Sequence, residues 1–242
     1  MAGMSVSPKA LSLAMCAPCP TPWGAGWHHN SRMDDIVKQA LAKWPNVPDC
    51  FGWLGLDARG NWYMRDDRAQ AAGPFSAQAA APPASALAGG TLQSKGSMLK
   101  HEKLIDFIQR NYESDATGRW FFQNGPQKVY VELEATPWIW RIGRGLSPGS
   151  NLGPDGGLDV FEVTAHDGRA AQVQRCVLDE LGRVYLATDI GFGLVHTQDV
   201  ALAADAVEAG VWLPQEMPSI ELPQRFGYVP SPQQQPRQLC NI

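Results

Sequence analysis

One short phrase recurs three times in this chain: LDARGNWYM at residues 56–64, SDATGRWFF at residues 114–122 and LDELGRVYL at residues 178–186. Each copy places Asp three residues before Gly, then Asn or Arg, and then a pair of aromatic or β-branched residues. Asp and Gly at this spacing form a tight turn, and the run that follows favours a strand. The chain therefore reuses one turn-into-strand unit, and we expect its architecture to follow from that unit.

The sequence between the copies predicts helices and further strands. Apolar residues at helical spacing predict one helix over residues 34–44 and another over residues 98–112. Asn124-Gly125 predicts a tight hairpin, and the alternating sequences around it predict a three-stranded antiparallel meander. Two more strands and the third copy of the phrase follow, and residues 197–209 read as a helix.

These elements predict an α+β fold with antiparallel sheets built from repeated turn-strand units, each packed with a helix. Two related subdomains are expected. The first covers residues 33–142 and contains a low-complexity insertion at residues 69–97, and the second covers residues 158–210. Residues 143–157, rich in Gly, Pro and Ser, read as the linker between them.

The two ends of the chain lack regular hydrophobic periodicity. We expect residues 1–32 to be a disordered leader or a mis-assigned translation start. Residues 211–242 are rich in Pro and Gln, and the spacing of the prolines predicts an extended tail without regular structure. We expect this tail to lie over the surface of the protein and to contact it through Phe226 and Tyr228.

The composition is that of a folded protein, with 44% apolar and 18% charged residues. The net charge of −4, without any cluster of Lys or Arg, argues against duplex nucleic acid or an anionic membrane surface as a partner. No apolar stretch is long enough to predict a transmembrane helix. Five scattered cysteines do not suggest a disulfide framework, so we expect a reduced, cytoplasmic setting.

Residues 52–142 resemble families of unknown function that are mainly proteobacterial. The resemblance rests on GWLGLDARGNWYM, on the helical sequence KHEKLIDFIQRNY and on GRWFFQNGPQKVYVELEATPWIWRI. A wider uncharacterised family is also similar, but the chain departs from its Thr-Pro-x-Glu-Lys pattern at residues 125–128, where Gln replaces Glu. The resemblance implies an α+β fold of repeated strand-helix units. Because these families have no assigned activity, it implies no catalytic residue, and only analogy favours a signalling or ligand-sensing role.

Motifs that would hold a metal ion or a cofactor are weak. Cys16 and Cys19 with His28 and His29 have the ligand types of a zinc site, but their surroundings lack the fold that a structural zinc ion organises. The glycine-rich residues 143–149 lack the lysine and the following helix of a phosphate-binding loop. We therefore predict no metal ion and no cofactor.

A pair of carboxylates is the basis of an enzymatic hypothesis. Glu132 and Glu134 are two residues apart on a predicted strand and so share one face of it. With His166 or His196 they could divide acid and base roles in a hydrolase. Polar residues at alternate positions are also typical of a solvated sheet face, which is the interpretation we favour.

The aromatic residues are more numerous than one core requires. Neighbouring aromatics on a strand face opposite sides of a sheet, so they cannot all enter the same core. Trp138 and Trp140 share a side, with Arg141 close by and Trp120 on a neighbouring strand, and could stack a base, a sugar ring or a peptide aromatic. The alternative is that these tryptophans fill two small cores or lie beneath the tail.

Three functions remain open at this point. We favour a non-enzymatic binding, adaptor or ligand-sensing protein that contacts a protein or a small ligand through an aromatic-lined sheet surface made of Trp120, Trp138, Trp140 and Arg141. The alternatives are a hydrolase that uses Glu132 or Glu134 with a histidine, and a purely structural or homodimerising domain.

Overall fold

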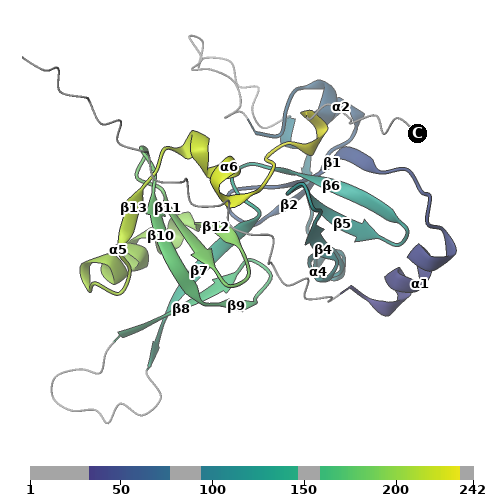
Figure 1. Ribbon diagram of the computed structural model, residues 1–242. Helices are drawn as coiled ribbons and strands as arrows, with labels where there is room; N and C mark the ends of the chain where they lie inside the picture. The colour runs from purple at the N-terminus through teal and green to yellow at the C-terminus, as the bar shows by residue number, and fades with distance from the viewer. Residues whose placement is uncertain (1–32, 77–93, 147–158, 235–242) are drawn as a thin grey trace, which may run out of the picture.

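The computed structural model describes residues 33–76, 94–146 and 159–234 (Figure 1). The zinc-type residues of the N-terminus and most of the low-complexity insertion lie outside these ranges. Within them, no helix has both the length and the apolar character needed to span a membrane.

The first unit is a six-stranded sheet with the order β3-β2-β1-β6-β5-β4. Its strands are β1 (Cys50–Leu56), β2 (Trp62–Met64), β3 (Ser97–Met98), β4 (Tyr112–Ser114), β5 (Trp120–Asn124) and β6 (Gln127–Leu133). Its helices are α1 (Asp35–Lys43), α2 (Asp67–Ala71) and α4 (Glu102–Arg110). Helix α4 buries Ile108 and sets Phe107 edge-on to Phe122 of β5, with the ring centroids 5.4 Å apart.

The second unit is a seven-stranded sheet with the order β13-β10-β11-β12-β7-β8-β9. Its strands are β7 (Trp138–Leu146), β8 (Asp159–Ala165), β9 (Ala170–Ala171), β10 (Val173–Leu178), β11 (Val184–Thr188), β12 (Phe192–Val195) and β13 (Pro214–Glu216). Its helical segments are η2 (Thr197–Asp199), α5 (Val200–Glu208), η3 (Ser219–Glu221) and α6 (Leu222–Phe226). Helix α5 lies against β7 and buries Ala203 and Ala206.

The predicted α+β class with two subdomains is confirmed, but the sheets are mixed. Among the described strands, β1 pairs with β6, β7 with β12 and β10 with β13 in parallel, while the other pairs are antiparallel. In each parallel pair other elements intervene along the chain, so the returning strand can run in the same direction.

The boundary between the units differs from the predicted one. Strand β7 was expected to close the first unit, yet it pairs with β8 and β12 of the second sheet. Residues 143–146, expected as linker, continue that strand. The chain changes sheets at Thr136 and Pro137, where the Thr136 hydroxyl donates to the Trp138 carbonyl and accepts from the Leu194 amide, which ties β7 to β12.

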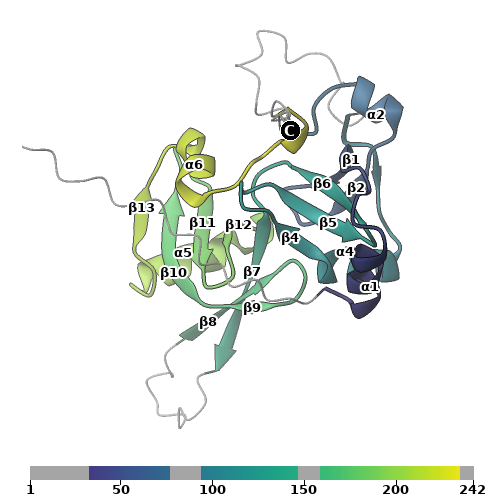
Figure 2. The same ribbon diagram turned by 45° about the vertical axis from the view of Figure 1, so that its right-hand side comes forward.

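The C-terminal segment is more ordered than an extended tail. Despite its prolines it contains β13, η3, α6 and a further 3-10 turn, η4 (Pro232–Gln234). Pro223 stands in the first turn of α6, where its missing amide hydrogen costs nothing. Phe226 and Tyr228 are buried as expected, and Phe226 stacks on Phe192 with the centroids 3.7 Å apart. Beyond α6 the chain passes from the second unit to the first, as both views show (Figures 1 and 2).

The three copies of the phrase form the same turn. In each, the Asp carboxylate accepts hydrogen bonds from the backbone amides two and four residues later, at 2.8–3.1 Å. The fourth residue of the turn is Gly60, Gly118 or Gly182, and its φ is between 74° and 83°. These angles lie in the left-handed region, where an L side chain is strained, so glycine is the residue that allows the turn to close.

The surroundings of the three glycines differ. A Cβ on Gly60 would lie 2.7 Å from the His166 Cβ, and a Cβ on Gly118 would lie 2.3 Å from the Gly227 carbonyl oxygen. A Cβ on Gly182 would meet nothing within 4 Å. The first two turns are therefore also contact points for parts of the chain that come from the second unit.

This difference predicts unequal effects of one substitution. Gly182→Ala should cost only the left-handed strain, about 1 kcal/mol. Gly118→Ala should cost roughly 2 kcal/mol more, since the methyl group would meet backbone atoms that cannot move aside without displacing residues 227–229. Urea unfolding at neutral pH measures both values. Equal losses for the two variants would show that the close approach at Gly118 does not contribute to stability.

Candidate functional site

The predicted aromatic surface is buried. Trp138 is 2% exposed and Trp140 is fully buried, and the Trp140 Nε1 donates to the Leu186 carbonyl at 2.9 Å. Trp120 is half-buried and sits edge-on to Trp138, with the centroids 5.2 Å apart. The expectation of an accessible shelf is wrong for Trp138 and Trp140, because β7 lies inside the second sheet. Trp138 packs on Tyr112 and Trp120 of the first unit, and Trp140 lies against β11 and β12 of its own sheet.

Arg141 is partly exposed, but it is committed to an ion pair. Its Nε donates to Asp199 at 2.6 Å, and the same carboxylate accepts from the Ile142 amide at 3.1 Å. Although burial raises the pKa of Asp199, its hydrogen bonds from Arg141 and the Ile142 amide hold it below the ordinary value. Arg141 therefore fixes η2 against β7, and it does not join the tryptophans in a common surface.

The two glutamates have separate structural partners. Glu132 is almost fully buried and accepts from the Ser231 hydroxyl and, at 3.1 Å, from the Gln233 amide. Burial raises its pKa. Glu134 accepts from the Lys95 ammonium at 2.7 Å and from the Ala58 amide at 2.9 Å.

Neither candidate histidine joins these carboxylates. The His196 Nδ1 accepts a hydrogen bond from the Gln198 amide at 3.1 Å, at the start of η2. His166 lies inside an aromatic cluster between the sheets. Each glutamate thus binds other groups in the described structure, and the arrangement required by the hydrolase hypothesis is not formed.

The segment over residues 227–234, which we call the C-terminal strap, joins the second unit to the first. Ser231 and Gln233 of the strap donate to Glu132, and the Pro230 carbonyl accepts a hydrogen bond from the Leu133 amide at 2.8 Å. The Val229 amide donates to the Gly118 carbonyl at 3.0 Å. The strap is therefore held at β6 and at the second copy of the repeated turn.

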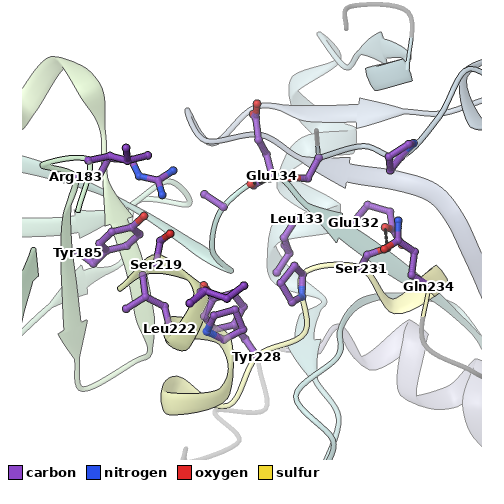
Figure 3. A pocket seen from close by; sticks show the side chains of 17 residues that line it. Glu132, Leu133, Glu134, Arg183, Tyr185, Ser219, Leu222, Tyr228, Ser231 and Gln234 are labelled. Carbon is purple, nitrogen blue, oxygen red and sulfur yellow. Dashed lines mark hydrogen bonds between the residues drawn. The ribbon is translucent and has the colours of Figure 1, made fainter. Parts of the chain in front are cut away.

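A groove of about 350 Å³ lies between the two units, with the strap along one side (Figure 3). The first unit contributes the end of β6 together with Pro74 and Ser76 after α2, and the second contributes the β10–β11 turn, η3 and α6. Most of the lining is apolar, and its principal side chains are Leu133, Ala135, Leu181, Ile220, Leu222, Pro223, Tyr228 and Pro230. We call this space the inter-unit groove; nothing in the sequence alone brings its lining residues together.

Charged side chains face the groove from opposite walls. Glu134 belongs to the first unit and Arg183 to the second (Figure 3). The Arg183 Nε donates to Asp179 at 2.7 Å, and its guanidinium carbon lies 5.8 Å from the centroid of the Tyr185 ring. Burial raises the pKa of Asp179, but the backbone and side-chain hydrogen bonds from Arg183 and the Tyr185 hydroxyl keep it below the ordinary value, so this pair stays ionised.

His166 is a buried titratable group where the two units meet. Its ring packs against Trp62 and Tyr112 of the first unit and Trp138 of the second, with centroid distances of 5.5–6.4 Å. Its Nδ1 accepts from the Ile139 amide at 3.4 Å. Burial lowers the pKa of His166 to about 4.

This burial predicts a loss of stability in mild acid. An unfolded histidine takes up its proton near pH 6.5, whereas folded His166 resists protonation until about pH 4. The unfolded state therefore binds more protons between these values, and the free energy of unfolding should fall by roughly 3 kcal/mol as the pH drops through them. Urea unfolding at intervals from pH 7 to pH 4.5 measures this slope.

Variants separate His166 from other titrating groups. His166→Phe, or His166→Gln if the first does not fold, should flatten the pH dependence, while His196→Gln should leave most of it. A slope that persists without His166 would assign the effect to other residues.

Comparisons with known proteins show the family without adding a function. No curated protein matches the sequence. A DUF1285 family protein from Silicibacter pomeroyi DSS-3 is similar in structure, with 12% identity, a TM-score of 0.40, and coverage of 66% of this chain and 72% of that one. The model of the DUF2944 family, described as "Protein of unknown function (DUF2946)", matches residues 33–233. The expected relation to an uncharacterised family is confirmed, and the chain belongs to this family of unknown function.

Proposed function

We propose that this protein is a non-enzymatic ligand-binding protein and that its site is the inter-unit groove. The observation that carries the proposal is that both units and the strap line one apolar space with a charged side chain on each wall. Its volume of about 350 Å³ is within the range of small-molecule sites, which are mostly apolar with a few polar groups.

The exposed aliphatic side chains support binding at this place. Leu181 and Ile220, both of which line the groove, are 66% and 85% exposed. The Glu180 carboxylate accepts from the Ser219 amide and hydroxyl, and this holds their two segments together. A ligand in the groove would cover both side chains and gain the free energy of removing them from water.

The chemistry of the lining favours binding over catalysis. Of the described residues that line the groove, none is His or Cys. The Ser219 and Ser231 hydroxyls each donate to a carboxylate that serves the fold.

We also propose that the protein is cytoplasmic. Cys50 and Cys176 support this, because both are free thiols.

A neutral apolar fluorophore tests the site. Ile220→Ser should weaken the binding of Nile red about fivefold, which corresponds to roughly 1 kcal/mol of lost apolar contact. Because Ile220 is so exposed in the free protein, this substitution should leave the unfolding midpoint almost unchanged. Fluorescence titration and thermal unfolding measure the two effects.

Leu213→Ser is the matched control. Leu213 is 79% exposed but does not belong to the groove lining, so its variant should bind Nile red like the wild type. Equal weakening in both variants, or none in either, would place the binding of the fluorophore elsewhere.

A further inference from the structure

We infer that the ligand of the inter-unit groove is a small apolar carboxylate and that Arg183 binds its carboxylate group. This inference rests on the proposed function, since it names the class of ligand that the same groove would hold.

Arg183 has more hydrogen-bond donors than its ion pair with Asp179 uses. A guanidinium group has five N–H donors in a planar fork that suits a carboxylate. Among the described residues, the Arg183 side chain donates a hydrogen bond from Nε to Asp179 at 2.7 Å. In Figure 3 the terminal nitrogens of Arg183 extend from the wall of the second unit toward the groove.

The chain contains a second copy of this arrangement that serves as an internal comparison. Asp115, Arg119 and Tyr130 repeat the contacts of Asp179, Arg183 and Tyr185: the Arg Nε and the Tyr hydroxyl both donate to the Asp carboxylate. In that copy, however, the Arg119 Nη2 also donates to the Tyr130 hydroxyl at 3.2 Å. Arg119 thus uses Nη2 for the tyrosine of its own copy and is not among the described residues that line the inter-unit groove, whereas Arg183 lines it.

The carboxylates around Arg183 are each bound by other groups, including Glu180, which accepts hydrogen bonds from the Ser219 amide and hydroxyl. The Asp179 carboxylate is already shared among the Leu181 amide, the Arg183 amide and Nε, and the Tyr185 hydroxyl, at 2.7–3.0 Å. Glu134 is neutralised by Lys95 at 2.7 Å. Glu132 directs its oxygens to Ser231 and Gln233 beneath the strap.

The rest of the lining suits the apolar part of such a ligand. Leu133, Leu222 and Pro230 are side chains with no polar atoms, and the exposed Leu181 and Ile220 stand at the rim. A carboxylate at Arg183 would place the remainder of the molecule over these residues. A charge-assisted hydrogen bond to the carboxylate then adds specificity to the apolar contact.

The experiment compares three ten-carbon probes, all below their micelle concentrations: decanoate, decan-1-ol and decylamine. Displacement of Nile red from the purified full-length protein measures their affinities. We expect decanoate to bind about tenfold more tightly than decan-1-ol, with decylamine the weakest. Arg183→Gln should remove the advantage of decanoate and leave the affinity for decan-1-ol unchanged.

Arg119→Gln is the control, since it makes the same change in the equivalent turn outside the groove. It should leave the preference for decanoate intact. If Arg183→Gln fails to fold, Arg183→Lys keeps the positive charge but loses the planar fork, and it should keep only part of the preference.

The outcomes distinguish the ligand class from the site. Suppose that decanoate and decan-1-ol bind equally well and that Ile220→Ser weakens both. The ligand would then not be a carboxylate, but the groove would still be the binding site. If neither Ile220→Ser nor Arg183→Gln changes the affinity of the probes, both proposals are wrong. A short peptide with a free C-terminus that displaces Nile red better than decanoate does would show that the ligand is a polypeptide, against this inference.

Discussion

The close approach permitted by two glycines determines how the units of this protein meet. The Asp-to-Gly turn closes in the same way in all three copies, because its carboxylate binds two backbone amides and its glycine adopts a left-handed conformation. At Gly60 and Gly118 the missing side chain leaves room for His166 and for the backbone at Gly227. The turn that precedes these strands thus also provides the surfaces on which the second unit and the strap pack.

Two connections of different character hold the units together, and both begin at these turns. One is the aromatic contact among Trp62, Tyr112, Trp138 and His166, which is buried. The other is the strap, which is held mainly by hydrogen bonds to Glu132, Leu133 and Gly118. The inter-unit groove is the space that these two connections leave open, so its shape depends on both.

The sequence predicted the local structure well because turns and strands depend on neighbouring residues. The α+β class, the helices near residues 34–44 and 98–112 and the hairpin at Asn124 and Gly125 follow from periodicity and turn chemistry. The place of β7 did not, since its pairing with β12 depends on residues almost 60 positions away. The aromatic residues were misassigned for the same reason: whether Trp138 faces solvent or another sheet is a property of the tertiary structure.

The groove could not be predicted because no motif encodes it. Its charged groups come from the end of β6 and from the third copy of the repeated turn. What distinguishes Arg183 from Arg119 is the position of each turn relative to the other unit. The proposed ligand would contact both walls only when the units and the strap are assembled, so its binding free energy would add to the stability of that assembly. Under this proposal, recognition of the ligand and association of the two units are thermodynamically linked.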